Sequence, residues 1–112
     1  MNKLAASLLF VLLTACSSIG LQEAKTLDQR IAFAYGTNTA LRDAAASAVV
    51  GKRLAVSDGE FVLKTTDQAR TTLDAARMAL GAGDTSTAEG RLVMVLGILT
   101  QVQAYLNSKG AQ

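Results

Sequence analysis

The residues that could do chemistry in this chain are few. The sequence contains no His, and its single Cys is Cys16. Without His, the Ser and Thr hydroxyls lack the commonest general base, and no Ser-x-x-Lys spacing offers a lysine in its place. A single Cys excludes an intramolecular disulfide and a Cys-cluster zinc site. We therefore expect no catalytic residue, no cofactor and no metal.

The carboxylates do not have the pattern of acid–base chemistry. Asp67 and Asp74 share one helical face, but Arg70 and Arg77 lie on it too, and the row begins with Lys64. A row that alternates in sign favours ion pairs on a solvated face, and a docking strip for a partner is the alternative. A net charge of +2 leaves no basic footprint for nucleic acid. The sequence therefore does not predict an enzyme.

Cys16 is the residue whose surroundings indicate a reaction. Met1-Asn2-Lys3 is a basic start, and an apolar run from Leu4 to Leu13 leads to the small pair Thr14-Ala15. This order is typical of a secretory signal. A transmembrane anchor is the alternative, but a span needs about 20 residues, more than lie between Leu4 and Cys16.

The stretch Leu13-Thr14-Ala15-Cys16 resembles the lipobox of bacterial lipoprotein precursors. The resemblance implies that the Cys16 thiol receives a diacylglycerol, that cleavage falls between Ala15 and Cys16, and that the new amino group is then acylated. Several acyl chains anchor a protein stably, whereas one chain binds only marginally. In lipoproteins of this kind Asp after the Cys retains the protein on the inner membrane, so Ser17 implies the outer membrane, facing the periplasm.

The remaining chain predicts an all-α fold. We expect a signal peptide over residues 1–15, a lipidated tether over 16–20, and a small antiparallel three-helix bundle over 21–112. A stripe at spacings of three and four predicts a first helix over 21–54. The stripe consists of Leu27, Ile31, Ala34, Asn38, Leu41, Ala45 and Ala48. The weak point of this helix is 36–39, where Gly, Thr and Asn have low helix propensity.

The second helix is expected to begin at Ser57. Ser57 and Glu60 have the spacing of a capping box, and Val56 and Phe61 that of the accompanying hydrophobic staple. An apolar stripe then runs along residues 62–80.

A glycine turn ends this second helix. Gly81 or Gly83 is expected in the left-handed conformation. Asp84 or Ser86 then caps a third helix that ends near Asn107.

The third helix is apolar on every side between Leu92 and Leu99. Such a helix is either buried or in a membrane, and this run is too short for a span. We expect it to be the central helix, with Leu96 and Leu99 buried. Because three helices can hardly bury a full cylinder, the surplus apolar surface favours a homodimer.

Two functional hypotheses follow. The first is a lipid-anchored envelope protein that serves as a structural or protein-interaction module for another envelope protein. The alternative is a phage or prophage effector lipoprotein for host lysis or superinfection exclusion, although the lack of Pro counts against lysis. Residues 67–80 and 99–106 are similar to small helical lipoproteins of proteobacteria and their prophages, which implies no site residues.

Tyr35 and Tyr105 are the candidate interface residues, because Tyr is enriched at binding hot spots. The alternative is packing at the edge of the core, with the hydroxyl in water.

Overall fold

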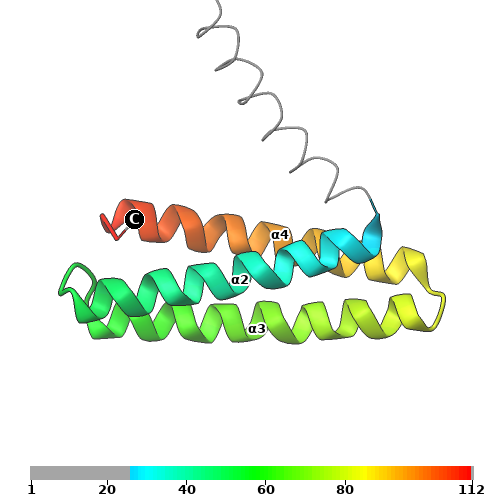
Figure 1. Ribbon diagram of the computed structural model, residues 1–112, viewed down its shortest axis with the longest axis horizontal. Coiled ribbons are helices and arrows are strands. Elements are labelled where there is room, and N and C mark those ends of the chain that lie inside the picture. Colours follow the sequence, from blue (N-terminus) through cyan, green and yellow to red (C-terminus); the bar gives the residue numbers. More distant parts are fainter. Residues whose placement is uncertain (1–25, 112) are drawn as a thin grey trace, which may run out of the picture.

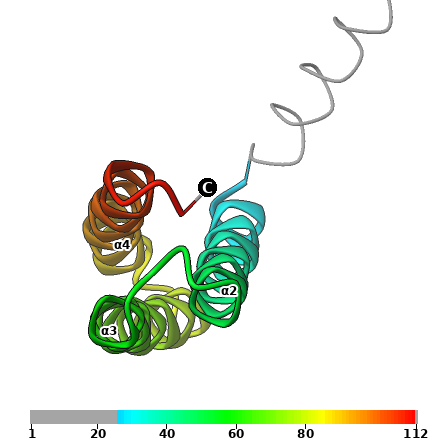
Figure 2. The same ribbon diagram turned by 90° about the vertical axis from the view of Figure 1, so that its left-hand side faces the viewer.

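The computed structural model describes residues 26–111, so the predicted signal peptide, the cleavage site at Ala15 and Cys16, and the tether lie outside the described residues. The described chain forms three helices, α2 (Leu27–Val50), α3 (Val56–Gly81) and α4 (Thr85–Ser108). Successive helices run antiparallel (Figure 1), and an end-on view places them at the corners of a triangle (Figure 2). The prediction of an all-α three-helix bundle is confirmed.

The core takes one stripe of residues from each helix. Spacings of three and four put these residues on one side of each helix, as the sequence predicted. Alanine makes up much of the buried stripes of α2 and α3, whereas the stripe of α4 is mostly leucine and valine. The buried aliphatic residues are Ile31, Ala34, Leu41, Ala45, Ala48, Leu54, Val62, Ala69, Leu73, Ala76, Ala88, Leu92, Val95, Leu99, Val102, Leu106 and Ala111.

The helix α2 is continuous through Gly36, so the weak point that low propensity predicted does not become a break. Buried residues on either side of Gly36, among them Ala34 and Leu41, hold this stretch against the other helices, and packing overrides propensity. The start of α2 carries a capping box that sequence reasoning missed. The Thr26 hydroxyl accepts from the Gln29 amide at 3.1 Å, and the Gln29 side chain accepts from the Thr26 amide at 3.3 Å.

The predicted capping box at Ser57 and Glu60 is wrong. The helix α3 begins one residue earlier, at Val56, with Ala55 as an N-cap that makes no side-chain bond. The Gly59 amide already donates to the Ala55 carbonyl at 3.0 Å, so Ser57 lies inside the first turn. The predicted staple does not form either, because Val56 is 64% exposed and the Phe61 ring packs on Tyr105 instead.

All three helices end in the same hydrogen-bonded turn, the Schellman motif. After α3, Gly83 has φ of 80°, which confirms the prediction of a left-handed glycine there, and the Asp84 amide donates to the Ala79 carbonyl at 2.9 Å. After α4, Gly110 takes the left-handed position. After α2, that position is held by Lys52, with φ of 60°, although glycine is the residue that adopts it without steric cost.

The helix α4 is not enclosed by its neighbours. Asp84 caps it by accepting from the Thr87 amide at 3.1 Å, as predicted, and Ser86 does not. Leu99 is buried as predicted, but the prediction for Leu96 is wrong, because its side chain is 37% exposed. Each helix of a three-helix triangle buries one side, so the apolar residues on the outer side of α4 remain at the surface.

Candidate functional site

The two tyrosines connect helices within the chain. The Tyr35 hydroxyl of α2 donates to the Asp74 carboxylate of α3, and the Arg77 guanidinium lies 5.6 Å from the Tyr35 ring centre. Tyr35 is half-buried, with its hydroxyl on a carboxylate rather than in water. Asp74 and Arg77, predicted as part of a solvated charge row, thus contact α2.

Tyr105 makes an equivalent contact at the other helix pair. Its hydroxyl, on α4, donates to the Asp58 carboxylate of α3. The Lys109 ammonium lies 3.8 Å from Asp58 and 5.5 Å from the centre of the Tyr105 ring, and the Phe61 ring is tilted against it at 4.9 Å. Each tyrosine therefore sits between a carboxylate and a cation, with its ring half-covered.

These surroundings raise the pKa of both tyrosines above the usual value. For Tyr35, burial is the main cause, and the hydrogen bond to Asp74 adds to it, while Arg77 opposes it. For Tyr105, the hydrogen bond to Asp58 is the main cause of the raised pKa, followed by burial. A neutral hydroxyl can donate to a carboxylate, whereas a phenolate would repel it. The tyrosines therefore act as neutral donors, and these contacts give no general base.

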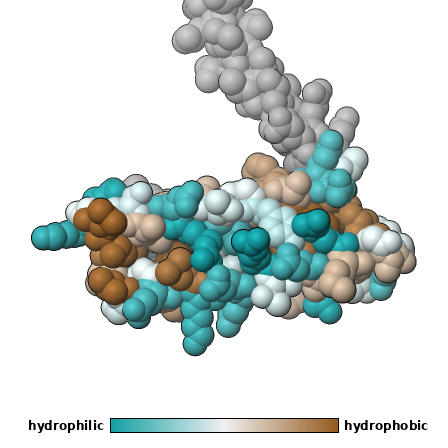
Figure 3. Space-filling model, turned by 60° about the horizontal axis from the view of Figure 1, so that its bottom comes forward, coloured by the Kyte–Doolittle hydropathy of each residue, from teal (hydrophilic) through white to brown (hydrophobic). Residues whose placement is uncertain are grey.

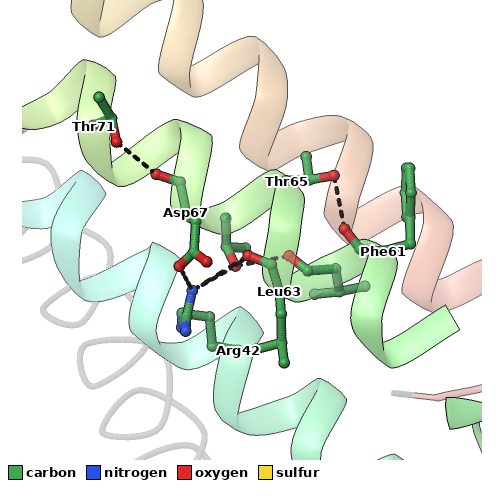
Figure 4. A network of polar contacts seen from close by, with 8 residues as sticks. Arg42, Phe61, Leu63, Thr65, Asp67 and Thr71 are labelled. Carbon is green, nitrogen blue, oxygen red and sulfur yellow. Dashed lines mark hydrogen bonds and ion pairs between the residues drawn. The ribbon is translucent and has the colours of Figure 1, made fainter. Parts of the chain in front are cut away.

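A polar network connects α2 and α3 midway along the bundle (Figure 4). Arg42 reaches across from α2 and pairs with the Asp67 carboxylate. The same guanidinium nitrogen lies 3.1 Å from the Thr66 hydroxyl and 3.4 Å from the Leu63 carbonyl. Thr66 is buried and donates back to the Val62 carbonyl at 2.7 Å. Because each of these groups has a partner within the bundle, the network is structural.

The clearest free surface on this side of the molecule is an apolar end at the α2–α3 loop. Apolar side chains gather there in Figure 3, and they line a shallow groove of about 290 Å³ between the two helices. Val50 is 85% exposed and Val56 is 64% exposed, one on each side of the loop. Lys52 and Arg53 are exposed in the loop itself.

A second free surface lies on α4. Val93 and Met94, each 59% exposed, project from the side of α4 opposite its buried stripe. The sequence predicted surplus apolar surface on this helix but did not locate it, and it placed Leu96 in the core. The periodicity of the buried residues, from Leu92 to Leu106, would have located it on the opposite side.

Within residues 26–111, no group of three or more His, Cys, Asp and Glu side chains is placed to hold a metal ion. Among the described helices, none has the length and apolarity to cross a membrane. Comparisons with protein-family models, curated proteins and solved structures give no match. The fold and these surfaces define a small three-helix bundle with exposed apolar residues at the α2–α3 loop and on the outer side of α4, besides Phe33 and Met78.

Proposed function

We propose that the chain is a lipid-anchored protein of the bacterial cell envelope that acts as a structural or protein-interaction module. The observation that carries the proposal is the sequence Leu13-Thr14-Ala15-Cys16 after a basic start and a short apolar run. Acyl chains on Cys16 would hold the protein on the membrane, and Ser17 favours the outer membrane, with the bundle in the periplasm.

The described bundle supports the second half of this proposal. Several of its charged and aromatic side chains make contacts between helices, as in the Arg42–Asp67 and Tyr105–Asp58 pairs. Exposed apolar residues gather at the end at the α2–α3 loop and on the outer side of α4, while Phe33 and Met78 are exposed elsewhere. Apolar areas of this kind on a small protein mark sites of interaction.

The experiment is metabolic labelling with a palmitate analogue in a Gram-negative host. We expect label in the wild-type chain and none in Cys16→Ser, because the thioether to diacylglycerol requires the thiol. The wild type should fractionate with the outer membrane, and Cys16→Ser should not. Identical processing of both chains with no label in either would contradict the proposal.

A further inference from the structure

The outer side of α4 differs from that of the other two helices in having no charge. Ser86, Gly90, Val93, Met94, Gly97 and Gln101 follow one another at spacings of three and four, so they share one side of the helix. All six are exposed, and we call them the outer face of α4. The nearest charged residues, Glu89 and Arg91, lie on its two flanks.

The corresponding side of α3 is charged, whereas that of α2 carries a single charged residue among uncharged ones such as Ala32, Gly36 and Ala40. The outer side of α3 exposes Glu60 and Lys64, and that of α2 exposes Asp43. Charged residues are the usual composition of a solvated helix face, and they are depleted at the centre of interfaces. The outer face of α4 thus has the composition of a contact rather than of a solvated surface.

The two glycines of this face have no explanation within the bundle. Glycine in a helix is less stable than alanine. A close neighbour that leaves no room for a Cβ can account for such a glycine. A Cβ added at Gly90 or at Gly97 would meet nothing within 4 Å. At Gly59, by contrast, it would lie 2.6 Å from a methyl of the Val49 side chain, so a close neighbour accounts for that glycine.

The order of residues on the outer face is symmetric about the midpoint between Val93 and Met94. If two copies of α4 lie antiparallel around a two-fold axis at that point, Gly90 of each faces Gly97 of the other, and Val93 faces Met94. One turn further out, Ser86 faces Gln101. Apolar residues then meet apolar ones, and polar residues meet polar ones. Val93 and Met94 lie between two notches, which are the gaps left by the missing side chains of Gly90 and Gly97.

We infer that the outer face of α4 binds a second copy of this chain in an antiparallel α4–α4 contact. A twofold contact requires a self-complementary patch, and this symmetry supplies it. Antiparallel helices also align their dipoles favourably. A bilayer is a poorer occupant, because glycine notches, Ser86 and Gln101 gain nothing from lipid.

The size of the face sets the expected strength. The face from Ser86 to Gln101 spans 16 residues, so it is about 24 Å long, and at a helix width of about 10 Å the strip of contact is roughly 240 Å² in projection. A standard interface buries about 800 Å² on each partner. We therefore expect a weak dimer, with a dissociation constant of about 1 µM to 1 mM. The inference does not depend on the lipid anchor.

Sedimentation equilibrium tests the contact on residues 16–112 carrying Cys16→Ser, since the core lies within residues 31–111. Met94→Lys should weaken dimerisation at least tenfold. Met78→Lys is the matched control, because Met78 is 77% exposed on α3, and it should leave association unchanged. Circular dichroism verifies that both variants fold. A parent chain that stays monomeric at about 1 mM, or equal association of the two variants, would overturn the inference.

Two glycine variants separate the dimer from the fold. Gly36, like Gly97, is exposed, lies within a helix and has nothing within 4 Å of an added Cβ. Gly36→Ala and Gly97→Ala should both raise the thermal midpoint of the monomer by a few degrees. Only Gly97→Ala should weaken dimerisation, because its methyl fills the notch. Unchanged association in Gly97→Ala would contradict the close contact.

A short thiol cross-linker determines the direction. Ser86→Cys and Gln101→Cys chains, each in the Cys16→Ser background, should cross-link when mixed and not when alone. Cross-linking of Ser86→Cys with itself would overturn the antiparallel arrangement.

Discussion

At the scale of single residues, Lys52 is the one described non-glycine residue with a positive φ, at 60°. It holds the left-handed position of the turn that ends α2, where the Arg53 amide donates to the Ala48 carbonyl at 2.8 Å. The left-handed conformation brings Cβ of an L-residue close to the following carbonyl, which costs roughly 1–2 kcal/mol. Glycine at the equivalent positions after α3 and α4 avoids this cost.

We therefore predict that Lys52→Gly stabilises the protein. Part of the gain is offset by the greater freedom of glycine in the unfolded chain, so the free energy of unfolding should rise by about 1 kcal/mol. Urea denaturation of residues 16–112 with Cys16→Ser measures it. Lys52→Ala is the control, because it removes the charge and keeps the Cβ, and it should give no gain. Equal effects of the two variants would assign the change to charge.

Asn38 shows what a sequence pattern cannot reveal about a residue. It falls on the buried stripe of α2, and the periodicity placed it there correctly, at 2% exposed. Its Oδ1 atom has no hydrogen-bond partner among the described residues. Spacing tells which side of a helix a residue occupies, but whether a buried amide finds a partner depends on the neighbouring helices. The left-handed φ of Lys52 is similar, because its residue type does not indicate a position that glycine usually holds.

At the scale of helices, the difference between Leu96 and Leu99 is testable. Leu99 is 3% exposed, and Leu96 is 37% exposed on the flank of α4. Leu99→Asp places an unpaired carboxylate in the core and should cost more than about 3 kcal/mol, which is enough to unfold a small bundle. Leu96→Asp should cost about 1 kcal/mol or less. Circular dichroism at 25 °C and urea titration measure both.

The Leu96→Asp chain serves as the control for the added charge. If it unfolded as readily as Leu99→Asp, the flank of α4 that carries Leu96 would have to be covered in the isolated chain, contrary to the triangle of helices.

The helices could be predicted from sequence because each buries one stripe, and a stripe is a local pattern. The predicted start of α3 at Ser57 failed because a helix start also depends on the preceding turn. Leu54, buried after the turn that closes α2, brings the chain to Ala55, and the first helical bond forms from there. A capping sequence one residue further on then lies inside the helix. The prediction that Asp84 caps α4 was correct, because the turn that ends α3 places Asp84 directly before the first residue of α4.

At the scale of the whole molecule, contacts between helices could not be predicted from the sequence. Tyr35 and Asp74 are 39 residues apart, and Tyr105 and Asp58 are 47 apart. Periodicity is a local signal and contains no information on which carboxylate a tyrosine will meet. The sequence singled out both tyrosines by their scarcity and predicted an interface role for them. The structure adds that their hydroxyls already connect the three helices of one chain.

These two contacts predict how the bundle responds to alkaline pH. Both tyrosines have pKa values raised above 10 in the folded chain, so folding favours the protonated form. Their stabilising contribution is fully present below pH 10 and is lost as the pH rises through the folded pKa values. Above that range, the phenolates of Tyr35 and Tyr105 face Asp74 and Asp58, and like charges separate α2 from α3 and α3 from α4.

We therefore expect the free energy of unfolding to fall as the pH rises above 10, and both phenol absorbance titrations near 295 nm to have midpoints above 10 in the folded chain. Lysines also lose their charge in this range, so the double variant Tyr35→Phe, Tyr105→Phe is the control. It lacks the ionisable hydroxyls and should lose less stability between about pH 9 and 11, the range around the reference pKa of tyrosine. Urea denaturation at each pH measures this loss. A decline as steep in the double variant as in the parent chain would show that other groups cause the alkaline loss. Folded-chain titration at or below 10 would show that the hydroxyls do not donate to the carboxylates in solution.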